Sequence, residues 1–366
     1  FEAGATRCII EGMNALQTLL GMPLPIIQAP MAGVQGHALA AAVCQAGGLG
    51  SLPGAMLTPE GLRSELAALT AATDRPYNVN FFCHTPPVPD AARQAAWLDA
   101  LAPCYAALGL SRNGVVAGPG RVPFNADALQ VLQAFRPPVV SFHFGLPDPT
   151  LLAPIKAWGG RVLASATTVD EALWLADHGA DAVIAQGLEA GGHRGHFLDH
   201  DLSRQMGTLA LLPQLVQALA GRGAGGLDVP VIAAGGIADA AGVAAAKALG
   251  AAGVQVGTAY LLCPEATTSV VHRAALQSDA ARHTTLTHLF TGRPARGIVN
   301  RFIRELGALN PAAPAFPLAT AAVAPLRAQA EAQGSGDYSP LWAGQNTRGC
   351  RAVPAGEITR ALAAGW

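Results

Sequence analysis

A histidine in an apolar setting is the first residue of this sequence that could do acid–base chemistry. His143 lies between Phe142 and Phe144, at the end of the apolar segment 139–144. An imidazole there can accept a proton or orient a small anion, and a purely structural histidine is the alternative. If the segment is a strand, both phenylalanines point away from the side that His143 faces. Two other histidines are weaker candidates for this role: His84, and His193, whose glycine-rich surroundings suit cofactor contact or gating.

Two glycine turns could hold a phosphate. Gly235-Gly236 and Gly257-Thr258 each follow an apolar segment and lead toward a helix. The start of a helix presents unpaired amides and a partial positive charge, which together favour an anion. The alternative is that these glycines only form tight turns. Because the two turns occupy equivalent places in the pattern, we favour the phosphate site.

Amide side chains and small residues accompany these turns. Asn80 and Gln186 can donate and accept hydrogen bonds at once, which suits the mixed edge of a flat ring system such as an isoalloxazine. Gly191-Gly192 and Met31-Ala-Gly33 offer little side-chain bulk apart from Met31, so a ring could approach the backbone closely. The alternative for either amide is a buried group that braces neighbouring loops.

Short apolar segments alternate with helical segments along most of the chain. The predicted strands are 24–28, 48–52, 77–82, 139–144, 161–164, 182–186, 229–233 and 253–256. The predicted helices are 37–46, 58–72, 89–101, 126–135, 150–158, 169–178, 207–220 and 239–249. Continuous apolar strands fit a parallel sheet buried on both faces, and eight strand–helix units predict a (β/α)8 TIM barrel. Barrel enzymes keep their active sites at the carboxyl ends of the strands and often bind phosphate after strands 7 and 8.

The chain is longer than a barrel requires. Its 366 residues exceed the roughly 250 of a typical barrel, so we expect two domains. Residues 13–265 would form the barrel, with an irregular connection at 104–125. Residues 266–366, where the strand pattern stops, would form a smaller, mostly helical appendage whose last part packs back on the barrel. Met13 is a candidate native start, which would make residues 1–12 a remnant foreign to the natural protein.

Composition argues against several classes of function. The net charge is −1 and no basic block occurs, so nucleic acid is not an expected partner. Six widely spaced cysteines without a C-x-x-C motif argue against disulfides and a zinc site, and indicate a cytoplasmic enzyme without a metal. No apolar segment is long enough to span a membrane. Because only 13% of the residues are charged, much surface must be buried, and a homodimer would bury it.

Several longer motifs follow one another between about residues 22 and 350. They are Gln28-Ala-Pro-Met-Ala-Gly33, Asn80-Phe-Phe82, Ser141-Phe-His-Phe-Gly145, Ala185-Gln-Gly-Leu-Glu-Ala-Gly-Gly-His-Arg-Gly195, Ala233-Ala-Gly-Gly-Ile237, Gly253-Val-Gln-Val-Gly-Thr258, Gly292-Arg-Pro-Ala-Arg-Gly297, Asn300-Arg-Phe302 and Trp342-Ala-Gly-Gln345. In this order they resemble the nitronate monooxygenase family, formerly called 2-nitropropane dioxygenases.

The resemblance implies an FMN-dependent enzyme that oxidises alkyl nitronates with O2 to a carbonyl compound and nitrite. A flavin semiquinone is the implied intermediate, and neither a metal nor a nicotinamide is needed. His143 matches the family's active-site histidine, which is the proposed base for neutral nitroalkanes and otherwise an anchor for the nitronate. The residues implied to contact FMN are Ala29, Pro30, Met31, Asn80, Gln186, Gly191, Gly192, Gly235, Gly236, Gln255, Val256, Gly257 and Thr258.

Some features depart from the family and leave other functions open. Val34 stands where the family more often has glycine, and only four tyrosines occur, so the substrate is less defined than the cofactor. An FMN-dependent enoyl-thioester reductase and an NADH:quinone reductase are the enzyme alternatives, and both would consume a nicotinamide. A flavin-binding sensor or storage protein is the alternative without catalysis.

Overall fold

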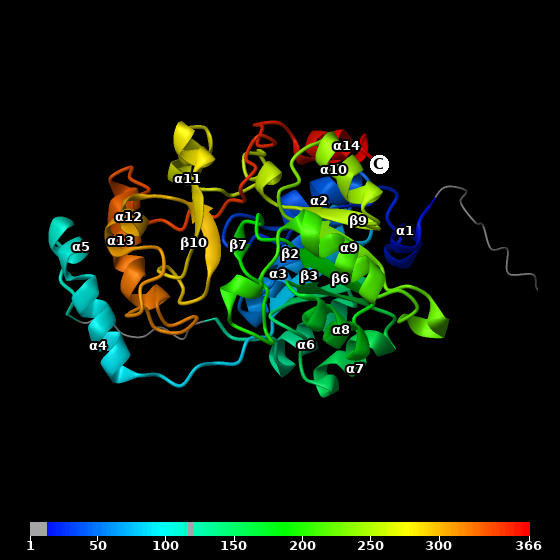
Figure 1. Ribbon diagram of the computed structural model, residues 1–366, viewed down its shortest axis with the longest axis horizontal. Coiled ribbons are helices and arrows are strands. Elements are labelled where there is room, and N and C mark those ends of the chain that lie inside the picture. Colours follow the sequence, from blue (N-terminus) through cyan, green and yellow to red (C-terminus); the bar gives the residue numbers. More distant parts are fainter. Residues whose placement is uncertain (1–12, 114, 116–120) are drawn as a thin grey trace, which may run out of the picture.

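The computed structural model describes residues 13–113, 115 and 121–366. The remnant expected at residues 1–12 lies outside the described residues. The described chain forms a barrel and a smaller lobe beside it, with the barrel at the right of Figure 1. No helix among the described residues combines the length and apolar character that crossing a membrane requires.

Eight parallel strands form the barrel. They are β1 (Ile26–Gln28), β2 (Gly50–Pro53), β3 (Tyr77–Phe82), β4 (Val139–His143), β5 (Arg161–Ala166), β6 (Ala182–Gln186), β8 (Val231–Ala234) and β9 (Gly253–Val256). Their order around the sheet is β1-β9-β8-β6-β5-β4-β3-β2. Leu49, just before β2, exchanges backbone hydrogen bonds with Ile26 and Gln28 of β1 and so joins the two ends of this order. The predicted (β/α)8 fold is confirmed.

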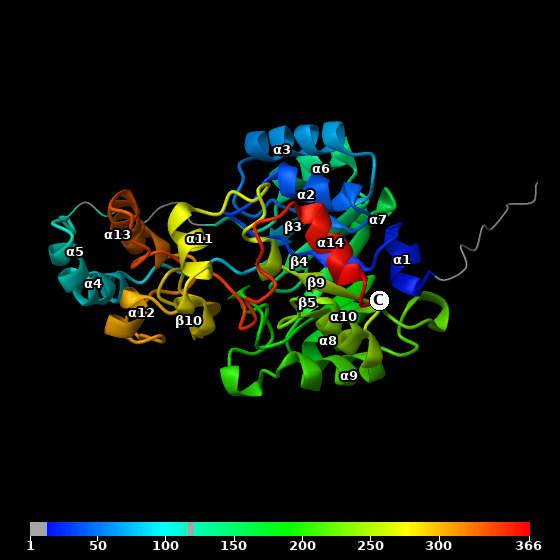
Figure 2. The same cartoon turned by 90° about the horizontal axis from the view of Figure 1, so that it is seen from above.

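Helices cover the outside of the barrel, as Figure 2 shows. They are α2 (His37–Gln45), α3 (Pro59–Ala72), α6 (Ala126–Phe135), α7 (Pro149–Ala157), α8 (Val169–Asp177), α9 (Thr208–Ala218), α10 (Ala240–Ala248) and α14 (Ala355–Ala363). Helix α14 comes from the end of the chain and lies against α2 and α10. Short 3-10 turns are η1 (Leu202–Arg204), η2 (Ala224–Gly226), η3 (Thr258–Tyr260) and η4 (Asp279–Arg282).

A short helix fills the amino-terminal end of the barrel. Helix α1 (Ala15–Leu20) places Leu16 and Leu20 in one buried cluster with Leu163 of β5. At Gly253, where β9 starts, an added Cβ would lie 2.6 Å from Leu16 Cδ2, so this glycine lets the helix approach. The plugged end leaves the carboxyl ends of the strands as the open side of the barrel.

The smaller lobe combines a three-stranded antiparallel sheet with helices. The sheet contains β10 (Thr284–Thr287), β11 (Ala295–Ile298) and β7 (Gly192–His193), and the helices are α4 (Ala91–Ala100), α5 (Ala102–Ala107), α11 (Val270–Leu276), α12 (Arg301–Leu306) and α13 (Thr320–Ala332). Trp97 of α4 and Tyr105 of α5 share a buried cluster with Phe290, Phe302 and Tyr338. The part of the β3–β4 connection that holds α4 and α5 therefore crosses over to the smaller lobe, as the labels in Figure 1 show, before the chain returns to the barrel at α6.

Two expectations for this lobe were wrong. The strand pattern does not stop at residue 265, because β10 and β11 follow, and α5 lies partly inside the stretch 104–125 that was expected to be irregular. The segment of β10, Thr-Thr-Leu-Thr, lacks the continuous apolar character that marked the barrel strands. The domain boundary at residue 265 stays a prediction.

Candidate active site

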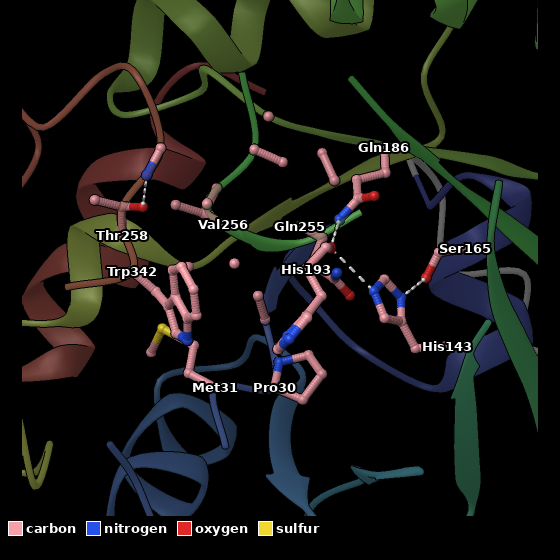
Figure 3. Close-up of a pocket in the computed structure, with 18 of the residues that line it drawn as sticks. Pro30, Met31, His143, Ser165, Gln186, His193, Gln255, Val256, Thr258 and Trp342 are labelled. Carbon is pink, nitrogen blue, oxygen red and sulfur yellow. Dashed lines mark hydrogen bonds between the residues drawn. The ribbon is translucent and has the colours of Figure 1, made fainter. Parts of the chain in front are cut away.

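A cavity opens at the carboxyl ends of the barrel strands (Figure 3). His143 and all the residues that were predicted to contact FMN line it: Ala29, Pro30, Met31, Asn80, His143, Gln186, Gly191, Gly192, Gly235, Gly236, Gln255, Val256, Gly257 and Thr258. The barrel thus gathers side chains and turns from six strands at one place. Their roles toward a cofactor stay predictions.

His143 ends β4 with both ring nitrogens hydrogen-bonded, as the dashed lines in Figure 3 show. Nδ1 lies 2.7 Å from Ser165 Oγ, and Nε2 lies 3.1 Å from the main-chain oxygen of His193. A carbonyl oxygen only accepts, so we assign the proton to Nε2, and Nδ1 accepts from the Ser165 hydroxyl. Burial, and to a lesser degree the charges of Arg293 and Arg194, lower the pKa of His143 to about 3, although the His193 carbonyl favours the protonated ring. The ring is therefore neutral near pH 7.

The prediction that Phe144 points away from His143 was wrong. Phe142 does point outward, into a buried cluster between the strands and the helices. Phe144, however, has a φ of 71° and Gly145 a φ of 91°, so the strand ends at His143 and alternation stops there. The ring of Phe144 lies 4.5 Å from that of His143 and 4.9 Å from that of Phe82, between centroids. An aromatic wall therefore stands beside the histidine.

Gln186 braces the loop that follows β6. Its Nε2 donates to the His193 oxygen at 2.9 Å, and its Oε1 accepts from the Gly195 amide at 2.7 Å. Strand β7, within this loop, pairs with β11 of the smaller lobe. At Gly195 an added Cβ would lie 2.8 Å from Cε1 of His143. Both polar atoms of the Gln186 amide thus form hydrogen bonds to the protein backbone. This fits the bracing role, which was the alternative to a cofactor contact.

The turns after β8 and β9 present unpaired amides at the cavity. Among the described residues, none accepts a hydrogen bond from the backbone amides of Gly236, Ile237 and Thr258, and all three residues line the cavity. Asn346 Nδ2 donates to the Gly236 oxygen, and the Gly344 amide donates to Thr258 Oγ1, each at 3.0 Å. A segment near the end of the chain therefore holds both turns in place. Free N–H groups that line one cavity can form a suitable site for a phosphate.

One buried polar atom suits the flavin ring or the ribityl chain of FMN. The Oε1 of Gln255 is buried at the cavity and has no hydrogen-bond partner among the described residues. It could accept a hydrogen bond from a flavin N–H or a ribityl hydroxyl. Beside it, an added Cβ on Gly257 would lie 3.3 Å from Ala29 Cβ and 3.5 Å from Met31 Sδ, so the floor of the cavity is closely packed there. Together with the free amides, these residues fit FMN.

Several residues of the cavity wall were not predicted from the sequence. Ser165 is the last residue but one of β5, but the alanines on either side of it resemble an ordinary core segment. Trp342 appeared only as part of the family resemblance, and Arg121 gave no signal, because both come from segments outside the barrel. His84 does not line the cavity; its Nε2 lies 3.0 Å from the Arg121 oxygen.

The fold and the cavity define an α/β-barrel protein in which unpaired backbone amides after β8 and β9 share a cavity with a neutral histidine. In the described ranges, no group of three or more His, Cys, Asp and Glu side chains is placed to hold a metal ion. The chain also matches known proteins over almost its whole length. The family model described as nitronate monooxygenase matches residues 13–365.

Three known proteins illustrate the match. The nitronate monooxygenase of Paraburkholderia phytofirmans is 44% identical, with 96% of this chain and 94% of that protein covered. A crystal structure of nitroalkane oxidase from Streptomyces ansochromogenes has a TM-score of 0.84 at 41% identity, covering 96% of this chain and 97% of that one. FabK from Thermotoga maritima has a TM-score of 0.67 at 26% identity, covering 95% and 94%. The chain belongs to the nitronate monooxygenase family, as the motifs predicted, and is an oxidoreductase.

Proposed function

We propose that the protein binds FMN in this cavity and oxidises alkyl nitronates with O2 to a carbonyl compound and nitrite. The observation that most directly supports this proposal is that unpaired amides after β8 and β9 share one cavity with the neutral His143 at the end of β4. Membership of the nitronate monooxygenase family and the likeness to a nitroalkane oxidase support the choice of substrate. A cytoplasmic location and a homodimer stay predictions from composition.

The chain's own groups would hold the cofactor by its two polar ends. The amides of Gly236, Ile237 and Thr258 would bind the phosphate, and Gln255 Oε1 would accept from the flavin or its ribityl chain. Bound FMN would supply the electron acceptor through which electrons of the substrate reach O2. Because the protein groups are already in place, little rearrangement would be needed on binding.

His143 would orient a nitronate rather than deprotonate a nitroalkane. Its Nε2 carries a proton that now points at the His193 carbonyl. A nitronate is an anion whose oxygens accept hydrogen bonds, so it can compete for this donor. A neutral nitroalkane needs a base, and an imidazole whose pKa is lowered to about 3 is a weak one. We therefore expect nitronates to react much faster than neutral nitroalkanes.

The test compares substrates on the FMN-loaded protein without a nicotinamide. Ethyl nitronate should give O2 uptake and nitrite together, and nitroethane should give nitrite more slowly. No nitrite from either substrate, together with rapid anaerobic flavin reduction by NADH or NADPH, would overturn the proposal. That outcome would favour the enoyl-thioester reductase or the quinone reductase.

A further inference from the structure

Ser141 places a buried hydroxyl group in the lining of the cavity. It lies two residues before His143 on β4, so both side chains point to the same side of the strand, into the mouth of the barrel. Only 1% of Ser141 is exposed. The proposed reaction does not use this hydroxyl, so its hydrogen bonds indicate what else it could do.

Two amide side chains occupy the oxygen of this hydroxyl. Asn78 Nδ2 donates to Ser141 Oγ at 2.9 Å, and Asn80 Nδ2 donates to it at 3.0 Å. A hydroxyl group has two lone pairs and one hydrogen, so these two bonds use both lone pairs. Apart from the two amides, no group of the described residues is hydrogen-bonded to Ser141 Oγ. Because Ser141 lines the cavity, its hydrogen can be donated to a ligand there.

Asn80 presents the opposite polarity beside this hydroxyl. Its Nδ2 also donates to the backbone oxygen of Ser141 at 3.2 Å. Because a carbonyl oxygen can only accept, this contact fixes which end of the amide is the nitrogen. Both N–H bonds of Asn80 are thus used within the protein, and its Oδ1, which has no donor among the described residues, is left for a ligand. A donor on Ser141 and an acceptor on Asn80 therefore lie side by side at the cavity.

This pair matches one edge of an isoalloxazine ring. The pyrimidine end of that ring carries an N–H group between two carbonyl oxygens. Asn80 Oδ1 can accept from the N–H group, and the Ser141 hydroxyl can donate to a neighbouring carbonyl oxygen. Strands β4 and β3, which carry the pair, stand opposite β9 and β8 in the ring order of the barrel. A flavin whose phosphate is held after β8 and β9 would therefore extend its ring across the barrel mouth toward the pair.

A second serine shares the same network without reaching the cavity. Ser51 of β2 accepts from Asn78 Nδ2 at 3.0 Å and is fully buried. It is not among the residues that line the cavity. Ser51 and Ser141 thus have the same side chain and the same partner, Asn78, but only Ser141 can touch a ligand. This difference makes Ser51 a control for the structural part of the Ser141 contacts.

We propose that Ser141 is a cofactor-binding residue whose hydroxyl donates to a carbonyl oxygen of the flavin, while Asn80 accepts from the adjacent N–H group. The inference rests on one part of the proposed function, the binding of FMN. Reduction places more negative charge on this end of the flavin ring, so a donor there stabilises the reduced ring more than the oxidised ring. Ser141 would thereby raise the reduction potential of the bound cofactor.

Alanine variants of the two serines test the proposal. Each removes one hydroxyl from Asn78, so both should lower the melting temperature to a similar degree. Ser141→Ala should also bind FMN about 2- to 10-fold more weakly, the usual worth of one hydrogen bond, and its bound flavin should have a more negative reduction potential. Ser51→Ala should match wild type in both flavin measurements. Ser141→Thr, which keeps a hydroxyl, should lie closer to wild type than Ser141→Ala.

Flavin analogues test the same contacts on the wild-type protein. FMN methylated at the ring N–H should bind more weakly, because Asn80 Oδ1 would meet a methyl group instead of a donor. Two further analogues carry sulfur in place of one or the other of the flanking carbonyl oxygens, and sulfur is a weak acceptor. One of these two should bind more weakly than the other, and Ser141→Ala should abolish the difference.

Three outcomes would overturn the proposal. An FMN affinity and a reduction potential in Ser141→Ala equal to those of wild type would place the hydroxyl hydrogen on Asn78, inside the barrel. Equal changes in Ser141→Ala and Ser51→Ala would indicate a structural role common to both serines. Equal binding of all three analogues and FMN to the wild-type protein would show that this edge of the ring is not contacted.

Failure of the proposed function would look different. If the wild-type protein bound FMN but oxidised no nitronate, the proposed reaction would be wrong. A weaker FMN affinity and a more negative reduction potential confined to Ser141→Ala would still support the contact between Ser141 and the flavin.

Discussion

The location of one proton decides what His143 can do. Its Nε2 faces a carbonyl and its Nδ1 faces the Ser165 hydroxyl, so the ring can donate at Nε2 but is a poor base. The place of His143 could be predicted from the sequence, because an end of an apolar strand is a local feature. Its tautomer could not, since Ser165 and the His193 carbonyl come from other strands and loops.

Replacing His143 tests this role. His143→Ala should keep FMN bound and lower nitrite release from ethyl nitronate by about 10²- to 10³-fold, the usual cost of removing one positioned donor. His143→Asn, which keeps an N–H group, should lose less. Steady-state nitrite release and the flavin absorbance of the purified variants give the two readouts. Rates near wild type with both ethyl nitronate and nitroethane would remove His143 from the mechanism.

At the scale of elements, the barrel could be predicted because its strands are buried on both faces. Strands of this kind form continuous apolar segments in the sequence. The observed bounds of β3, β6 and β9 are the ones predicted from these segments. Strand β10 has no such segment and was missed. The turn that brings Phe144 beside His143 depends on a left-handed φ at a phenylalanine, for which a sequence carries no local signal.

The loop after β6 can be tested at one glycine. In Gly195→Ala the new Cβ would lie 2.8 Å from Cε1 of His143 and 3.1 Å from Ser165 Cβ, so the histidine must move. We expect nitrite release to fall at least about 10-fold, since small displacements of reacting groups are costly, with a melting temperature close to that of wild type. Gly61→Ala in α3 is the matched control, because its nearest atom would lie 3.5 Å away. Full activity of Gly195→Ala would mean that the loop does not fix His143.

At the scale of the whole molecule, the two lobes meet at the cavity. Gly344 and Asn346 reach back from the end of the chain to the turns after β9 and β8, and β7 joins the sheet of β10 and β11. The order of motifs along the sequence predicted the family but not these contacts. Sequence distance gives no measure of how a late segment folds back over an early one.

Buried neutral histidines should make the stability of the whole protein depend on pH. Burial lowers the pKa of His84 and His272 to about 4 and that of His143 and His196 to about 3. In the unfolded chain a histidine titrates near 6.5, at about its reference pKa. The unfolded chain therefore takes up protons below about pH 6.5 that the folded chain does not. This part of the stability is fully present above pH 6.5 and is lost as the pH falls toward 4.

Urea unfolding at pH 7.5, 6.5, 5.5 and 4.5 measures the effect. The free energy of unfolding should fall between pH 6.5 and 4.5, with up to about 1.4 kcal/mol per pH unit from each neutral histidine. His196→Gln should flatten this slope by about one proton, because His196 is buried. His283→Gln, at an exposed position, should leave the slope unchanged. A free energy of unfolding that rises on acidification, or an unchanged slope in His196→Gln, would contradict the prediction.

The central claim is that the turns after β8 and β9 hold the phosphate of FMN. Titration of flavin-free protein with FMN and with riboflavin, followed by quenching of flavin fluorescence, tests this directly because the two ligands differ only in the phosphate. We predict that FMN binds at least about 100-fold more tightly, since each hydrogen bond to a charged group contributes about 1.5–3 kcal/mol. Equal affinities for the two flavins, or binding of neither, would contradict the claim.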